Sequence, residues 1–206
     1  FIRGNVAPPV GNSLSSPFSL EQTPAPSASR DLEKLNLAGC ISIVQDEPFA
    51  GLLQLLNSPS LDSLQFLNLS ALPLGVKWQV PLCKAIRIHP SIRTLSLADT
   101  GLGTRSSGDE DDNTMACVVE LLSSKNIVHL DLSWNCFGSV GFDFLGQKLI
   151  ELGILEKLDL AHCSTLSKKS PWTSSMVHLL EHLRDNKSLR KLNISGNYLD
   201  FRAALV

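Results

Sequence analysis

The chain has 206 residues, and its 18 Lys and Arg against 20 Asp and Glu give a formal net charge of −2. A nucleic-acid-binding domain usually carries a basic excess, so this balance argues against direct binding of nucleic acid. No stretch of about 18 consecutive apolar residues occurs, so we expect no membrane span. The cysteines number five, an odd count without a Cys-x-x-Cys pair, which favours reduced thiols in an intracellular protein of the nucleus or cytoplasm.

Residues 1–31 differ in composition from the rest of the chain. They are rich in Pro and Ser and show no sustained hydrophobic periodicity. Such a segment buries too little apolar surface to offset the loss of chain entropy on folding. We therefore expect a flexible linker over 1–31, followed by a folded domain over 32–206.

One nine-residue phrase recurs six times after this linker. The windows are LEKLNLAGC from Leu32, LQFLNLSAL from Leu64, IRTLSLADT from Ile92, IVHLDLSWN from Ile127, LEKLDLAHC from Leu155 and LRKLNISGN from Leu189. Their starts are separated by 32, 28, 35, 28 and 34 residues. A recurring distance of this length is the signature of a repeat protein, here with a period of about 28 residues and polar insertions at 103–114 and 164–175.

Each phrase predicts a strand, and the second part of each repeat predicts a helix. In the L-x-L core of the phrase, leucines alternate with polar residues, which sends the leucines to one face of the strand. The segments 114–125, 137–153 and 174–186 carry apolar residues at helical spacing. In the second of these segments they are Phe142, Leu145, Leu149, Ile150 and Leu152. The predicted fold class is α/β, a solenoid of six repeats with a curved parallel sheet inside and helices outside.

The phrases fit the pattern L-x-x-L-x-L-x-x-N/C and, over residues 32–206, resemble leucine-rich repeats of the ribonuclease-inhibitor-like subclass. This resemblance implies a solenoid that binds proteins across its concave sheet. A Pro- and Ser-rich linker leading into irregular repeats is also similar to the C-terminal repeat region of Tonsoku-type proteins, which implies a nuclear scaffold of chromatin replication and repair. The sixth repeat stops partway into its helix, so we expect the repeat domain to be truncated at its C-terminus.

The sequence lacks the short motifs that mark common catalytic sites, namely the phosphate-binding loop, the H-E-x-x-H zinc helix and the G-x-S-x-G elbow. His178 and His182 have the spacing of a metal-binding pair on a helix, but a solvated or half-buried pair is the interpretation we favour. The acidic run 109–112 lacks the alternating spacing of a calcium loop. We therefore expect a non-catalytic protein with no cofactor, no metal and no small-molecule substrate.

The informative surface of this fold is the concave face. Counting from the first residue of each phrase, the third, fifth, seventh and eighth places are predicted to point outward. Small residues fill the seventh place from Ala38 to Ser195 and predict a shallow trough. Aromatic residues at outward positions favour a binding site, and carboxylates beside them favour a partner with a basic segment. The predicted partner-binding residues are Phe66, Asp99, His129, Asp131, Trp134, Asp159 and His162.

Other interpretations remain open at this stage. Trp134 would also fit a side chain that merely covers the turn after its strand. Repeats of this subclass occur in GTPase-activating proteins, where Arg93 or Arg105 on the rim would be candidates. A third possibility is the substrate-receptor arm of a ubiquitin ligase, which would need an F-box upstream. The leading hypothesis is a protein-binding scaffold.

Overall fold

Each repeated phrase forms one short strand, and the strands lie side by side in chain order. The computed structural model describes residues 31–40, 46–103, 112–151, 153–164 and 175–199, which belong to the unit Asp31–Val206. Its strands are β1 (Lys34–Asn36), β2 (Phe66–Asn68), β3 (Thr94–Ser96), β4 (His129–Asp131), β5 (Lys157–Asp159) and β6 (Lys191–Asn193). They form one parallel sheet in the order β1-β2-β3-β4-β5-β6, so the predicted fold class is confirmed.

The register confirms the place-by-place alignment of the phrases. Third-place residues pair with third-place residues across every strand boundary, as in Thr94 with His129, and fifth-place residues pair likewise, as in Asp131 with Asp159. Neighbouring side chains in such a row are separated by about 4.8 Å, the strand spacing. A list of residues at one place of the phrase is therefore a list of neighbours across the sheet.

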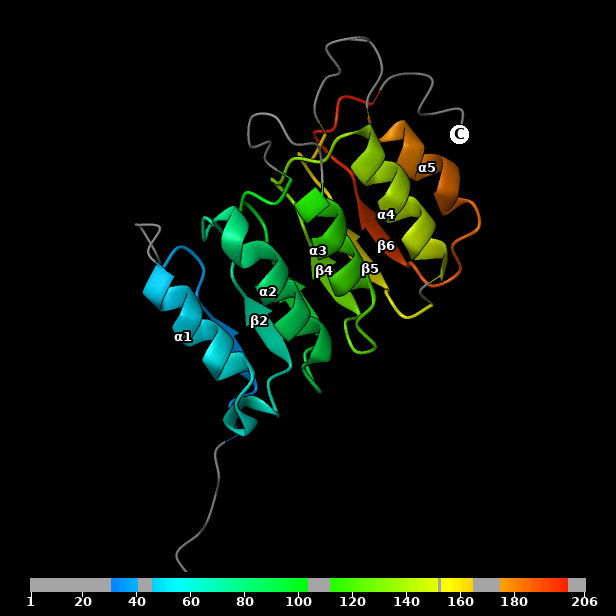
Figure 1. Cartoon of the computed structure of the whole chain (residues 1–206). Helices are drawn as coiled ribbons and strands as arrows, with labels where there is room; N and C mark the ends of the chain where they lie inside the picture. The colour runs from blue at the N-terminus through cyan, green and yellow to red at the C-terminus, as the bar shows by residue number, and fades with distance from the viewer. Residues whose placement is uncertain (1–30, 41–45, 104–111, 152, 165–174, 200–206) are drawn as a thin grey trace, which may run out of the picture. The chain divides into compact units, whose positions relative to one another are not determined.

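Helices cover one face of this sheet. The described helices are α1 (Asp46–Leu56), the short 3-10 helix η1 (Pro59–Leu61), α2 (Val76–Ile88), α3 (Asp112–Leu122), α4 (Ser139–Glu151) and α5 (Val177–Leu183). Figure 1 shows α1 to α5 side by side in chain order, with the strands behind them. The closest helix packing joins α2 to α3 and α4 to α5. The three predicted helices are all present, with ends that differ from expectation by two or three residues.

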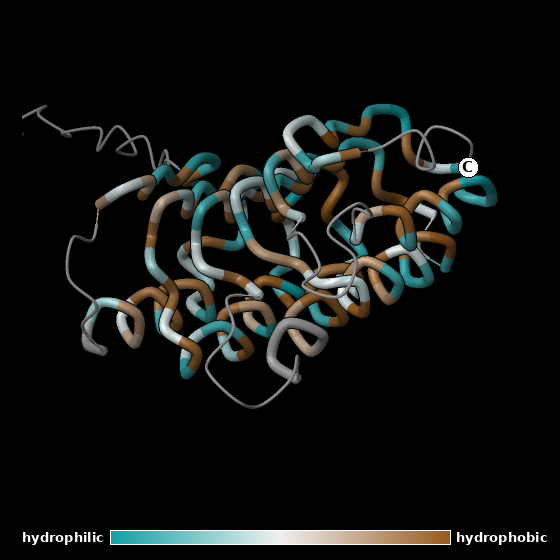
Figure 2. Tube along the Cα trace, turned by 90° about the horizontal axis from the view of Figure 1, so that it is seen from above, coloured by the Kyte–Doolittle hydropathy of each residue, from teal (hydrophilic) through white to brown (hydrophobic). Residues whose placement is uncertain are grey.

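The core lies between the sheet and the helices. Leucines from the fourth and sixth places of the phrases, such as Leu95 and Leu132, are buried together with Phe142 and Leu149 of α4. Figure 2 shows apolar stretches recurring from one strand–helix unit to the next. Ile150 is 41% exposed, because it follows Leu149 on the helix and points away from the core. Among the described helices, none is both long and apolar enough to cross a membrane.

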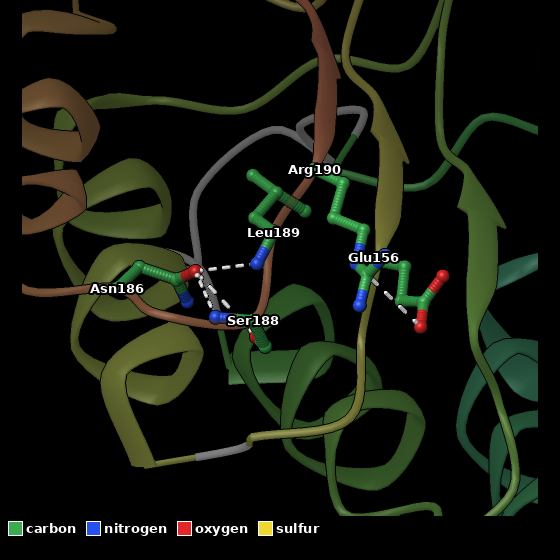
Figure 3. A network of polar contacts seen from close by, with 5 residues as sticks. All are labelled: Glu156, Asn186, Ser188, Leu189 and Arg190. Atoms are coloured by element: carbon green, nitrogen blue, oxygen red, sulfur yellow. Dashed lines mark hydrogen bonds and ion pairs between the residues drawn. The ribbon is translucent and has the colours of Figure 1, made fainter.

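The turn from α5 into β6 is held by one asparagine. Asn186 Oδ1 accepts hydrogen bonds from the backbone N–H groups of Ser188 (3.1 Å) and Leu189 (2.8 Å), and its Nδ2 donates to the Leu149 carbonyl at 2.6 Å. Figure 3 shows this turn beside the ion pair of Arg190 with Glu156, residues at the same place of neighbouring phrases. These bonds fix the turn over residues 186–189, whereas α5 itself ends at Leu183, three residues before the end that the apolar spacing predicted.

Asparagine at the ninth place ties one repeat to the repeat before it. Asn135 Nδ2 donates to the Leu97 carbonyl at 2.7 Å, and Oδ1 accepts from the backbone N–H groups of Thr100 (3.2 Å) and Leu102 (3.0 Å). Asn197 makes the same bonds one pair of repeats further on, to the Leu160 carbonyl and the Cys163 N–H, each at 2.7 Å. Buried backbone groups at each turn thus gain partners where the strand ladder has ended.

Several sequence-based expectations concern residues outside those described. These are the linker over 1–31 apart from Asp31, most of both insertions, the acidic run as far as Asp111, and Arg105.

Candidate functional site

The eighth place of every phrase has a left-handed backbone. The φ angles are 64° at Gly39, 56° at Ala71, 53° at Asp99, 59° at Trp134, 55° at His162 and 70° at Gly196. A ladder of backbone hydrogen bonds runs through this turn, since the N–H of Asp99 donates to the Ser133 carbonyl at 2.9 Å and that of Trp134 to the Ala161 carbonyl at 2.8 Å. The eighth-place residues therefore stack in a column along the carboxyl ends of the strands.

Two rings in this column stack on each other. The centroids of Trp134 and His162 are 4.0 Å apart, and their planes are inclined by 19°. Gly196 makes room for them, because a Cβ atom there would lie 2.3 Å from the His162 ring. Trp134 remains 60% exposed. The indole that stacks on His162 is therefore largely accessible to solvent.

Asp99 is the next member of the column, on the other side of Trp134. It is exposed, and within the described residues its carboxylate has no hydrogen bond or ion pair. Its backbone N–H is fixed by the bond to the Ser133 carbonyl in the repeat of Trp134. The carboxylate is therefore available beside the indole.

Asp131 and Asp159 occupy the fifth place, and their carboxylates accept hydrogen bonds from neighbouring residues in addition to carrying negative charge. Asp131 accepts from the Ser133 N–H at 3.0 Å and the Ser96 hydroxyl at 2.8 Å, and Asp159 accepts from the Ala161 N–H at 3.0 Å. The two carboxylates lie directly beside each other across the β4–β5 boundary. Like charges in this position are destabilising, so the pair makes the local surface receptive to a cation.

Two residues of the expected shallow trough along the seventh place are buried in the middle of the sheet. Ser133 is only 8% exposed and Ala161 only 7%. The Ser133 hydroxyl donates to Asp131 at 2.7 Å, which turns it toward its own strand. Short side chains between the carboxylates of the fifth place and the rings of the eighth are screened from solvent. The accessible surface is therefore made by the longer residues on either side.

His129 and Phe66 lie apart from this cluster. Both occupy the third place, at the opposite end of the strands from Trp134, and Phe66 is half-buried on β2, two strands away from β4. The His129 ring lies 3.4 Å from the Thr94 hydroxyl. Burial, followed by the charge of Lys157, lowers the pKa of His129. The structure thus brings together Asp99, Trp134 and His162, with Asp131 and Asp159 beside them.

The predicted histidine pair on α5 is divided between two environments. His182 Nε2 lies 2.8 Å from Asp143 Oδ1 on α4, and Gly146 lets the ring approach, since a Cβ there would lie 2.7 Å from His182 Cδ2. His178 takes no part in this contact. No cluster of three or more His, Cys, Asp or Glu side chains suited to a metal ion occurs in the part of the chain that the structure describes.

Comparison with known proteins points to one class of repeat. A family model described as Leucine Rich repeat matches residues 123–145. A Tonsoku-like protein of Danio rerio is 29% identical over 143 residues, which cover 69% of this chain and 10% of that protein. The NACHT, LRR and PYD domains-containing protein 3 of Rattus norvegicus is 35% identical over 99 residues, 48% of this chain and 9% of the relative. The chain thus spans about a tenth of the length of these relatives.

Solved structures share the fold at low sequence identity. The leiomodin-1 actin-binding site 2 superposes with a TM-score of 0.54 and 16% identity, over 80% of this chain and 86% of that one. The tropomodulin C-terminal domain of Caenorhabditis elegans gives a TM-score of 0.55 and 16% identity, over 78% and 88%. The sheet built from the repeated phrase, the family-model match and the repeat-containing relatives together identify the chain as a leucine-rich-repeat protein.

Proposed function

We propose that this chain is a non-catalytic scaffold that binds a protein partner on the sheet face turned away from the helices, which we call the open face. The observation that carries the proposal is the exposed Trp134–His162 stack at the edge of this face. Aromatic side chains that keep a large accessible area on a rigid framework are the usual anchors of protein interfaces. Here the framework is rigid because a backbone hydrogen-bond ladder holds each turn of the column.

The charge around the stack supports a partner with a basic segment. Asp99 stands on one side of Trp134 in the column, and the paired carboxylates of Asp131 and Asp159 lie on the adjoining strands. Complementary charge mainly speeds association and selects among partners. Replacing Asp131 and Asp159 by Asn keeps the Oδ1 acceptors of the turn hydrogen bonds and removes the charge, while the Oδ2 acceptors of Ser96 and Asn193 become N–H donors. The double variant should therefore associate more slowly, most clearly at low salt.

The setting we propose is nuclear, in chromatin replication and repair. What supports it is the resemblance of the Pro- and Ser-rich segment and the irregular repeats to Tonsoku-type proteins, together with 29% identity to the Tonsoku-like protein over 143 residues. The likeness to leiomodin-1 and tropomodulin concerns the fold, and an actin-type partner is an alternative outcome of the experiment below.

Site-directed photo-crosslinking in cells tests the location of the partner. A benzophenone amino acid replaces Lys157, which is exposed on the open face, or Gln147, which is exposed on α4. We expect one partner to be crosslinked through position 157 and not through position 147. Crosslinks through position 147 alone would place the partner on the helices and contradict the proposal.

Purified partner then tests the anchor. Trp134→Ala should weaken binding by about 2 kcal/mol or more, as central aromatic anchors do. The matched control is Val140→Ala on α4, since Val140 is 55% exposed and also apolar. We expect Val140→Ala to leave the dissociation constant unchanged, and equal affinities of both variants would refute Trp134 as the anchor. Thermal unfolding of each variant shows that the comparison is between folded proteins.

A further inference from the structure

The column of eighth-place residues leaves one face of the Trp134 indole open. His162 covers the other face, with ring centroids 4.0 Å apart on neighbouring repeats. This separation is close to the strand spacing of about 4.8 Å, so the rings lie roughly across the direction in which the column runs. The free face of the indole must then be turned toward the preceding repeat, where Asp99 holds the same place of the phrase.

We propose that the free face of the Trp134 indole and the neighbouring Asp99 carboxylate, a pair of groups that we call the slot, bind an arginine side chain of the protein partner. This inference rests on the proposed function, because it names the group that the partner contributes to the same face. A cation over an indole is attracted by the ring electrons. A guanidinium is planar, so it stacks on the ring while the N–H groups at its edge reach a carboxylate. A lysine ammonium satisfies the charge but not the stacking.

Two other aromatic rings of the chain already have a lysine over them. Lys77 Nζ lies 5.0 Å from the centroid of Trp78, and Lys148 Nζ lies 5.8 Å from that of Phe144. Within the described ranges, no lysine or arginine lies over Trp134, and none forms an ion pair with Asp99. The lysines on the described strands of the open face stand at the third place, toward the other end of the strands, and are Lys34, Lys157 and Lys191. The slot is therefore not filled by a described side chain of the protein itself.

The left-handed backbone belongs to the turn of every phrase, since Ala71 at the same place also has a φ of 56°. Trp134 and Asp99 hold φ angles of 59° and 53°. For residues other than glycine, the left-handed conformation costs roughly 1–2 kcal/mol. Gly39 and Gly196 occupy the same place in other repeats and avoid this cost.

Fluorine NMR of the full chain labelled with 5-fluorotryptophan tests the slot directly. The Trp134 signal is assigned by its loss in Trp134→Phe, and Trp78, which is stacked on Phe49, serves as an internal reference. The probes are three five-residue peptides, Gly-Ser-X-Ser-Gly with blocked ends, in which X is arginine, lysine or citrulline. Citrulline keeps the shape of arginine and removes its charge.

We expect the arginine peptide to shift the Trp134 signal saturably, the lysine peptide to bind several-fold more weakly, and the citrulline peptide to have no effect. Asp99→Asn should weaken the arginine peptide by about two- to fivefold, as expected for an exposed ion pair. Asparagine tolerates the left-handed backbone, so the fold is kept. The matched control Asp185→Asn, at an exposed site in the α5–β6 turn, should change nothing.

Two results would overturn the slot. One is an equal response to all three peptides, and the other is a Trp134 signal that arginine leaves unmoved. If position 157 still crosslinks a partner in either case, the proposed function stands and only the slot is wrong. If arginine binds at Trp134 while crosslinks form only through α4, the slot stands and the proposed location of the partner is wrong.

Discussion

Replacement of Gly196 by alanine should damage the Trp134–His162 stack more than it damages the fold. Two effects act at this residue. Its φ of 70° is unfavourable for alanine, and the new Cβ would lie 2.3 Å from the His162 ring. Gly39→Ala separates the two effects, because Gly39 has a similar φ of 64° and no atom within 4 Å of its Cβ position. Backbone strain alone should cost Gly39→Ala about 1 kcal/mol.

Gly196→Ala should lose the same amount of unfolding free energy through backbone strain, and it should also lose part of the stacking energy of Trp134 and His162. The His162 ring ends a flexible side chain, so it will swing away rather than distort the backbone, and it then leaves the indole. An aromatic pair contributes about 0.5–1.5 kcal/mol beyond area burial, so the total loss should be about 1.5–2.5 kcal/mol. Urea unfolding measures both losses, and tryptophan fluorescence of the folded variants reports whether the ring has left the indole. Equal losses and an unchanged Trp134 environment would refute this account of the column.

Three further predictions concern stability and thiol chemistry. Leu132→Ala should lower the free energy of unfolding by about 2–5 kcal/mol, because Leu132 is buried, whereas the exposed control Lys157→Ala should change it by less than about 0.5 kcal/mol. Equal losses in urea unfolding would show that the register is wrong. Burial lowers the pKa of His89, so its contribution to stability is present above the unfolded pKa of about 6.5 and is lost as the pH falls. Between pH 7.5 and 5.5 the urea midpoint of His89→Gln should therefore fall less than that of the unchanged protein, and an equal fall in both would exclude His89 as the cause. Burial raises the pKa of the Cys163 thiol to about 12, so in native protein a maleimide should modify the exposed Cys40 and spare Cys163 until urea unfolds the chain, as mass spectrometry of the peptides would show.

The sequence predicted the sheet because its signal is local and repeated. Each phrase contains the strand, its buried leucines and the residue that turns the chain, so aligning the phrases also aligned the strands. Thr100 at the ninth place departed from the pattern, yet its hydroxyl bonds the Leu97 carbonyl at 2.8 Å and so acts within the same turn. Helix ends were harder to predict, because apolar spacing does not reveal local hydrogen bonds such as those of Asn186, which fix the turn after α5.

The candidate site was predicted only in part, because the pattern of the phrases does not show which eighth-place side chains are in contact. Sequence patterns identified Trp134 and His162 as outward residues, but not that they touch. The available signal was the pair Gly39 and Gly196 in the same place, which indicates a left-handed turn and hence a continuous column. Hydrogen bonds from Asp131 back to its own turn were equally hidden, although Asp followed two residues later by Ser is typical of such turns. Phe66 was grouped with Trp134 because both are aromatic, while the register places them apart.

From the second repeat to the sixth, two kinds of contact between neighbouring repeats alternate along the chain: packing between helices and hydrogen bonds of ninth-place asparagines. Close helix packing joins the second repeat to the third and the fourth to the fifth. The ninth-place asparagines join the third to the fourth through Asn135 and the fifth to the sixth through Asn197. The boundary between the third and fourth repeats, where the helices pack less closely, is therefore bridged by an asparagine within the turns. In a linear array each repeat depends on its neighbours. One of the two contacts joins every pair of neighbours from the second repeat to the sixth. We therefore expect these repeats to unfold together.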